Sequence, residues 1–214
     1  MTTPEQGQRQ RLAAIFMADA VGFSRLMALD ESATVVALDS ARASFREQIQ
    51  VHDGRVVDTA GDSVLAVFDT ASAAIRAAMS AQKALEAQSA GRPPAKRLQY
   101  RIGVHVGEVI EKPDGTVYGD GVNVVARLQT LAEPGGVVVS GPVRGAVGGR
   151  LGVNYTDLGT HSVKNIVESL HAYGLHAPAN VDSWRSGGWL HALWALGFRR
   201  RGACLLYTSP SPRD

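Results

Sequence analysis

The chain has 214 residues, of which 45% are hydrophobic and 20% are charged, a balance that excludes wholesale disorder and collagen-like sequence. Its single cysteine, Cys204, excludes an internal disulfide framework and a thiolate zinc cluster. The net charge is +2, but residues 199–214 contain four arginines and one aspartate. The first 198 residues therefore hold 18 basic and 19 acidic residues. This balance argues against a nucleic-acid-binding surface on that part of the chain.

The first half of the chain alternates strand and helix patterns. A short apolar run predicts a buried strand at Leu12–Met17, which a polar turn separates from the next element. Apolar residues at helical spacing then predict a helix over Ser32–Val51. Two β-rich runs predict a hairpin, and an alanine-rich segment predicts a second helix. These are the strands Arg55–Thr59 and Ser63–Phe68 and the helix Thr70–Ser89.

The second half continues with a strand, a helix and further strands. Alternating hydrophobicity predicts a long strand over Gln99–Ile110, and a helix follows over Asp120–Leu131. Further strands are expected at Gly136–Ser140, around Val153–Asp157 and at Leu170–Gly174. The order β-α-β-β-α-β is typical of the ferredoxin-like core of α+β proteins. We therefore expect a mostly antiparallel sheet with helices on one face, and loops or a partner subunit covering the other.

Composition divides the chain into four segments. Residues 1–10 are expected to be a flexible leader without a secretory signal, and residues 11–178 one structured domain. Residues 179–203 are interpreted as a linker or the truncated start of a further region. Residues 204–214 resemble translated sequencing-adapter read-through, which would make them a non-native tail on a fragment of a longer protein. The apolar stretch 187–198 is shorter than the roughly 20 residues of a membrane span. Membrane association is therefore not indicated, and a cytoplasmic protein is expected.

Two acidic residues stand where predicted strands end. Asp19 follows the first strand, and Asp62 lies in the Ala60-Gly61-Asp62 turn of the hairpin. Each alone is more typical of a turn residue that makes a local hydrogen bond. If their strands are neighbours, however, the two carboxylates converge at one edge of the sheet. Paired carboxylates suit hard divalent cations, and two such ions can promote phosphoryl transfer.

Two further segments could contact a phosphate-bearing ligand. Backbone N–H groups of the turn Gly22-Phe23-Ser24 could hold phosphate oxygens. Asn123 and Arg127 are four residues apart and so share one face of the predicted helix. An arginine there could neutralise charge on a phosphoryl group, and an asparagine could bind a ribose oxygen. Each of these patterns is also common on ordinary surfaces.

Together, four segments resemble the catalytic domain of the class III adenylate and guanylate cyclases, in the form found in bacteria. The resemblance covers residues 11–176, about three quarters of the chain. The segments occur in the order and spacing of the family. They are Phe16–Ser24, Gly54–Phe68, Tyr100–Gly107 and Tyr118–Leu128.

The resemblance implies roles for individual residues. Two Mg²⁺ or Mn²⁺ ions per site would be held by Asp19, Asp62 and the backbone carbonyl of Ala20, while Asn123 and Arg127 would stabilise the transition state. The remaining implied contacts are with the substrate, a nucleoside triphosphate. They are Gly22, Phe23, Ser24 and the base-facing Asp58 and Thr116, together with Arg101 and Lys164 at the phosphates.

The resemblance also implies a reaction and an assembly. The ribose 3′-oxygen would attack the α-phosphorus of ATP, releasing pyrophosphate and forming 3′,5′-cyclic AMP. Because the metal ligands come from one subunit and the Asn–Arg pair from the other, a homodimer would contain two complete sites at its interface. The second subunit would also cover the open sheet face.

The base-facing positions leave the nucleotide open. Adenylate cyclases of the family typically have lysine where this chain has Asp58, whereas Thr116 occurs in some of them. A carboxylate can only accept hydrogen bonds, from adenine N6–H₂ or from guanine N1–H and N2–H₂. GTP is therefore the alternative to ATP. A catalytically degenerate nucleotide-binding regulatory domain is a further alternative, although the four residues Asp19, Asp62, Asn123 and Arg127 argue against it.

Other sequence patterns point to no additional chemistry. The chain has no P-loop motif, and it lacks the Gly-Gly-Asp/Glu-Glu-Phe turn of diguanylate cyclases, which share the core topology. His105 lies in a predicted strand and is expected to be a core histidine rather than a metal ligand.

Overall fold

The computed structural model describes residues 8–161 and 169–176 of the chain. The chain divides into two compact units, residues 1–178 and residues 179–214, and the second lies outside the described residues. The segments expected to be a linker and a non-native tail are therefore outside the description too. The first strand begins at Arg9, so the last two residues of the predicted flexible leader belong to the sheet.

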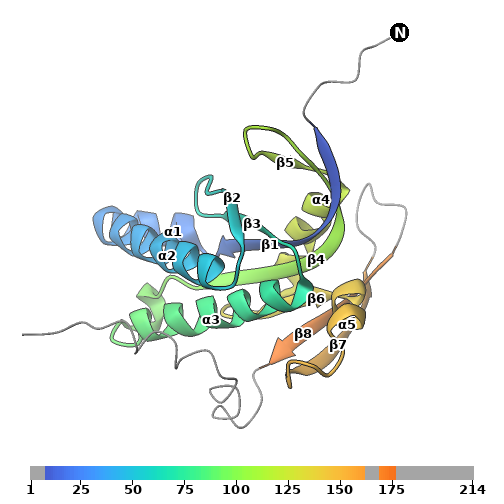
Figure 1. Ribbon diagram of the computed structural model, residues 1–214. Coiled ribbons are helices and arrows are strands. Elements are labelled where there is room, and N and C mark those ends of the chain that lie inside the picture. The colour runs from blue at the N-terminus through green and yellow to red at the C-terminus, as the bar shows by residue number, and fades with distance from the viewer. Residues whose placement is uncertain (1–7, 162–168, 177–214) are drawn as a thin grey trace, which may run out of the picture. The chain divides into compact units, whose positions relative to one another are not determined.

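The first unit is built on a mostly antiparallel sheet (Figure 1). Its strands follow the order β2-β3-β1-β4-β6-β8-β7, and β5 pairs with β4. All of these neighbours are antiparallel except β4 and β6. This confirms the predicted α+β class. The strands are β1 (Arg9–Ala20), β2 (Arg55–Asp58), β3 (Val64–Phe68), β4 (Tyr100–Glu111), β5 (Val117–Tyr118), β6 (Val137–Ser140), β7 (Asn154–His161) and β8 (Leu170–His176).

The two long helices begin at side chains that accept hydrogen bonds from their first turns. Asp30 accepts from the Ala33 amide at 3.0 Å, and Thr70 accepts from the Ala73 amide at 3.2 Å, satisfying donors that a helix start leaves free. The helices are α1 (Phe23–Leu29), α2 (Glu31–Val51), α3 (Ala71–Ser89), α4 (Asp120–Leu128) and α5 (Gly141–Val147). None of these helices, nor any other helix in the described residues, is long and apolar enough to cross a membrane.

Helices lie on both faces of the sheet, which corrects the expectation of helices on one face. Phe16 of β1 packs with Phe45 of α2 on one face, with ring centroids 6.0 Å apart. The neighbouring Ile15 points to the other face, where it belongs to a separate cluster with Val125 of α4. Figure 1 shows α2 and α3 crossing in front of the strands and α4 lying beyond β4.

Helix α4 approaches the sheet closely because glycines line the contact. A Cβ added to Gly103 of β4 would lie 2.8 Å from the Gln129 backbone nitrogen and 2.9 Å from the Val125 carbonyl oxygen. Both neighbours are backbone atoms and cannot rotate away. The sequence pattern of β4 did not reveal this role, because glycine in a strand has several possible causes.

We expect Gly103→Ala to destabilise the fold by about 1–3 kcal/mol, since the added methyl group must push α4 off the sheet. For a chain of this size, each kcal/mol lost from the free energy of unfolding should lower Tm by about 2–4 °C. Gly145→Ala is the matched control, because no heavy atom lies within 4 Å of a Cβ at that helical position. The control should be neutral or slightly stabilising. Equal Tm values for the two variants would contradict the close packing of α4.

Candidate active site

The two predicted carboxylates meet at one edge of the sheet. Asp19 is the penultimate residue of β1, and Asp62 lies in the turn between β2 and β3. The pairing of Ala18 with Val64 places this turn beside the end of β1. Burial raises the pKa of Asp19, the neighbouring Asp62 carboxylate raises it further, and Arg101 lowers it. The two carboxylates are thus close enough to repel each other.

The donors at this edge fit a divalent cation. Two repelling carboxylates are stabilised by a hard cation between them, and oxygen is the ligand atom that Mg²⁺ and Mn²⁺ prefer. Ala20, whose carbonyl is the third predicted ligand, ends β1 next to Asp19. Within residues 8–161 and 169–176, no group of three or more His, Cys, Asp and Glu side chains could hold a metal. Among the described residues, a metal held here would take its further ligands from backbone, water or substrate oxygens.

An arginine that sequence analysis missed holds the turn bearing Asp62. Arg42 of α2 donates through Nη2 to the carbonyl of Thr59 at 3.2 Å and to the carbonyl of Gly61. Gly61 has φ of 58°, a left-handed conformation that glycine adopts without strain. The turn is closed by Ser63, whose Oγ donates to the Ala60 carbonyl at 2.8 Å. Asp62 is therefore presented by a constrained turn.

Arg101 provides a cation next to the carboxylate pair. It is the cross-strand partner of Asp19, so both side chains project from the same face of the sheet. The Nε atom of Arg101 is buried and has no hydrogen-bond partner among the described residues. A buried donor without a partner is costly unless a ligand satisfies it. An anionic group bound beside the carboxylates would supply the missing acceptor.

Asn123 and Arg127 are presented on the outer surface of α4. The helix buries its other side, including Val124, Val125 and Leu128, against the sheet. Both polar side chains are exposed, four residues apart, as the sequence predicts. No hydrogen bond or ion pair in the described part of the chain joins either side chain to Asp19 or Asp62. Within one chain, the two halves of the predicted site are therefore not joined by a direct polar contact.

The predicted phosphate-binding turn forms the start of α1. Gly22 has φ of 66° and precedes the helix, which no side chain caps. Phe23 packs against the main core, whereas Ser24 is exposed. The turn follows β1 directly, so it lies immediately beyond Asp19 and Ala20 in the chain. Its contact with phosphate stays a prediction.

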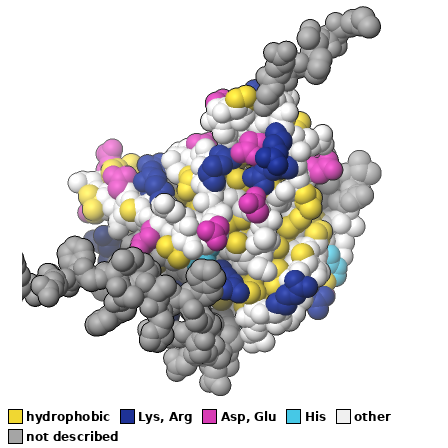
Figure 2. All heavy atoms as spheres, viewed as in Figure 1, with side chains coloured by type: hydrophobic (Ala, Val, Ile, Leu, Met, Phe, Trp, Pro, Cys, Tyr) yellow, Lys and Arg dark blue, Asp and Glu magenta, His cyan; other side chains and the backbone are white. Residues whose placement is uncertain are grey.

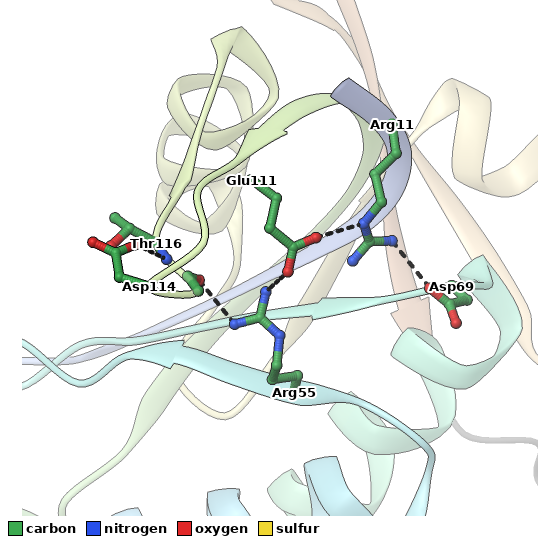
Figure 3. A network of polar contacts seen from close by, with 7 residues as sticks. Arg11, Arg55, Asp69, Glu111, Asp114 and Thr116 are labelled. Atoms are coloured by element: carbon green, nitrogen blue, oxygen red, sulfur yellow. Dashed lines mark hydrogen bonds and ion pairs between the residues drawn. The ribbon is translucent and has the colours of Figure 1, made fainter. Parts of the chain in front are cut away.

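The two base-facing positions lie on different elements. Asp58 is exposed at the end of β2, and Thr116 lies in the turn between β4 and β5, where its amide donates to Asp114 Oδ1 at 2.9 Å (Figure 3). No hydrogen bond joins Asp58 to Thr116 among the residues described. The remaining predicted contact, Lys164, lies outside the described residues.

His105 is half-buried in β4 rather than fully buried in the core. Its Nδ1 atom lies 2.9 Å from Oγ of the fully buried Ser140. Burial lowers the pKa of His105 to about 4, so the imidazole is neutral at physiological pH.

Comparison with known proteins finds the same family in the sequence. Residues 5–177 match the family model Adenylate and Guanylate cyclase catalytic domain. Putative adenylate cyclase 3 of Rhizobium meliloti is 40% identical over 169 residues, which are 77% of this chain and 28% of that protein. Guanylate cyclase 2G of Mus musculus is 33% identical over 165 residues, 70% of this chain and 15% of that protein. The chain thus spans less than a third of the length of these relatives.

Solved structures agree with the sequence matches. An adenylate/guanylate cyclase/hydrolase from Silicibacter pomeroyi superposes with a TM-score of 0.74 at 37% identity, covering 79% of this chain and 99% of that one. The adenylyl cyclase CyaB from P. aeruginosa has a TM-score of 0.70 at 20% identity, covering 79% of this chain and 96% of that one. At that lower identity the match concerns the fold alone.

Proposed function

Because the chain belongs to the adenylate and guanylate cyclase catalytic domain family, we propose that it converts a nucleoside triphosphate into a 3′,5′-cyclic nucleotide and pyrophosphate. The observation that carries this proposal is the meeting of Asp19 and Asp62 beside Arg101 at the end of β1. The two carboxylates could bind the metal ions, and the buried Nε–H group of Arg101 could donate to an oxygen of the metal-bound polyphosphate.

The chemistry requires one bond to form and one to break at the α-phosphorus. The ribose 3′-oxygen attacks in line, and the bond to the bridging oxygen of pyrophosphate breaks. Two Mg²⁺ or Mn²⁺ ions held by Asp19 and Asp62 would acidify the 3′-hydroxyl and neutralise phosphoryl charge. Arg101 binds triphosphate oxygens, and the N–H groups that follow Gly22 add further donors. Positioning and charge neutralisation supply most of the rate enhancement.

Asn123 and Arg127 complete the site from a second copy of the chain. They point away from their own sheet and make no ion pair with the carboxylates of the same chain, whereas that exposed surface is free to meet another molecule. The Arg127 guanidinium neutralises charge on the α-phosphoryl oxygens, and the Asn123 amide holds the ribose. Two copies related by a twofold axis then form two sites.

ATP is the proposed substrate, and GTP is the second candidate. The 40% identity to a putative adenylate cyclase supports ATP. The exposed Asp58 favours GTP, because a carboxylate accepts from both N1–H and N2–H₂ of guanine. The test is incubation of the purified chain with Mn²⁺ and both nucleotides, followed by chromatographic separation of the products. Linear hydrolysis products without a cyclic nucleotide would contradict the proposed function.

Asp58→Lys tests the base contact. If Asp58 reads the base, lysine should donate to adenine N1 and repel the guanine donors, raising the ATP-to-GTP ratio of kcat/KM by about tenfold or more. Glu47→Lys makes the same charge change on the exposed surface of α2 and should leave the ratio unchanged. A ratio that Asp58→Lys does not alter would show that this residue does not read the base.

A further inference from the structure

A network of charged side chains joins β2 to the turn between β4 and β5, residues 112–116 (Figure 3). Arg55, the first residue of β2, donates through Nη1 to the Gly115 carbonyl at 2.8 Å and through Nη2 to the Glu111 carboxylate. In Figure 2, Lys and Arg side chains lie beside Asp and Glu side chains over this part of the molecule. One guanidinium thus spans two strands that are distant in sequence.

Glu111 is itself held in place from the other side. Arg11 of β1 donates through Nε to Glu111 at 2.9 Å and through Nη1 to Asp69 at 3.0 Å. The Arg11 and Glu111 side chains are only 19% and 22% exposed, so water screens this pair less than an ordinary surface pair. The Arg11 hydrogen bond, assisted by Arg55, holds the pKa of Glu111 below its usual range. Arg55 therefore binds to a fixed carboxylate.

The turn that Arg55 holds is rigid around Gly115. The backbone carbonyl of Lys112 accepts a hydrogen bond from the Gly115 amide, and the backbone amide of Lys112 donates one to the Thr116 carbonyl, both at 2.9 Å. The Thr116 amide donates to Asp114 at 2.9 Å, and Gly115 has φ of 85°, a left-handed conformation. Fixing the carbonyl of Gly115 therefore also fixes the adjacent Thr116.

We infer that Arg55 is a positioning residue that sets the distance between Asp58 and Thr116 and thereby the purine selectivity of the site. This inference rests on the proposed function, in which both residues face the base. Arg55 starts the four-residue strand that ends at Asp58, and it bonds to the residue preceding Thr116. The described partners of Arg55 are Gly115 and Glu111, so in the proposed site it would act through the two segments that it connects.

The test compares Arg55→Met with Arg11→Met in the full chain. Methionine keeps an apolar stem of similar length but donates no hydrogen bond, and Arg11 shares Glu111 with Arg55 without contacting the turn. We expect Arg55→Met to change the ATP-to-GTP ratio of kcat/KM by about tenfold, mainly through KM, because a shifted segment misplaces the base contacts. Arg11→Met should lower Tm to a similar extent but change the ratio much less, because the hydrogen bond from Arg55 to the Gly115 carbonyl remains.

Two additional measurements separate the role of Arg55 from the proposed catalytic function. Arg55→Lys retains the charge and one donor group but not the fork, so its ratio should lie between wild type and Arg55→Met. Dissociation constants for 3′-deoxy-ATP and 3′-deoxy-GTP, which lack the attacking hydroxyl, report selectivity without turnover. A wild-type chain that forms no cyclic nucleotide would defeat the proposed function, and the ratio of these constants would still decide the role of Arg55. An unchanged ratio in Arg55→Met, or an equal change in Arg11→Met, would overturn it.

Discussion

Asp19→Asn and Asp62→Asn should each lower turnover by about a hundredfold or more, to near background. An amide is neutral and a poor ligand for hard divalent cations, and the site has only two carboxylates to lose among its described residues. In the proposed site, either change therefore removes one of the two carboxylates that would hold the metal ions. Cyclic nucleotide formed per minute at saturating Mn²⁺ and substrate is the measurement.

Thermal unfolding separates this loss of activity from loss of fold. Burial and the Asp62 carboxylate raise the pKa of Asp19, so ionising this carboxyl opposes folding, and the cost develops as the pH rises from the ordinary pKa of an aspartate through the raised value. Asp19→Asn removes this cost, so its Tm without metal should equal or exceed that of wild type. Mn²⁺ should raise the Tm of wild type and not that of the variant.

Asp53→Asn is the matched control for both variants. Asp53 is exposed in the turn after α2 and has φ of 57°, a conformation that asparagine also adopts readily. The activity of the Asp53→Asn variant and the rise in its Tm with Mn²⁺ should both match those of wild type. Turnover near wild type in Asp19→Asn or Asp62→Asn would end the two-carboxylate interpretation.

Local sequence patterns predicted most of the sheet and both long helices. Apolar periodicity placed α2 within one residue of its observed start, and the hairpin of β2 and β3 formed where β-rich runs flank a Gly-Asp turn. Helix α1 lies where the sequence pattern indicates a polar turn. It has seven residues, buries only Leu26 and follows a glycine without a capping side chain, so it lacks the usual signals.

Features that depend on distant contacts could not be read from the sequence. The position of α4 on the second face depends on Gly103, which is small where Val125 and Gln129 approach. Arg42 and Arg55 look like ordinary surface arginines until the fold brings carbonyl oxygens to them from 17 to 60 residues away. In contrast, the proximity of Asp19 and Asp62 could be predicted, because one lies at the end of a recognisable strand and the other in the turn of a recognisable hairpin. Their role as metal ligands stays a prediction.

Mixing two inactive variants should restore activity if complete sites form between copies. Asp19→Asn lacks the carboxylate pair but keeps Arg127, and Arg127→Ala lacks the cation but keeps the carboxylates. A dimer containing one of each has one intact site. After subunits of an equal mixture exchange freely, half of the dimers are mixed, so about a quarter of wild-type activity should return.

The decisive control is a mixture of Asp19→Asn with Asp62→Asn. Both variants are defective on the same side of the site, so no combination of their subunits contains an intact carboxylate pair. This mixture should stay inactive even when differently tagged copies co-purify. The rate of cyclic nucleotide formation in the two mixtures therefore tests whether each site is shared between two chains. Recovery only with Arg127→Ala is the predicted result, whereas recovery in neither mixture or in both would contradict a site shared between two chains.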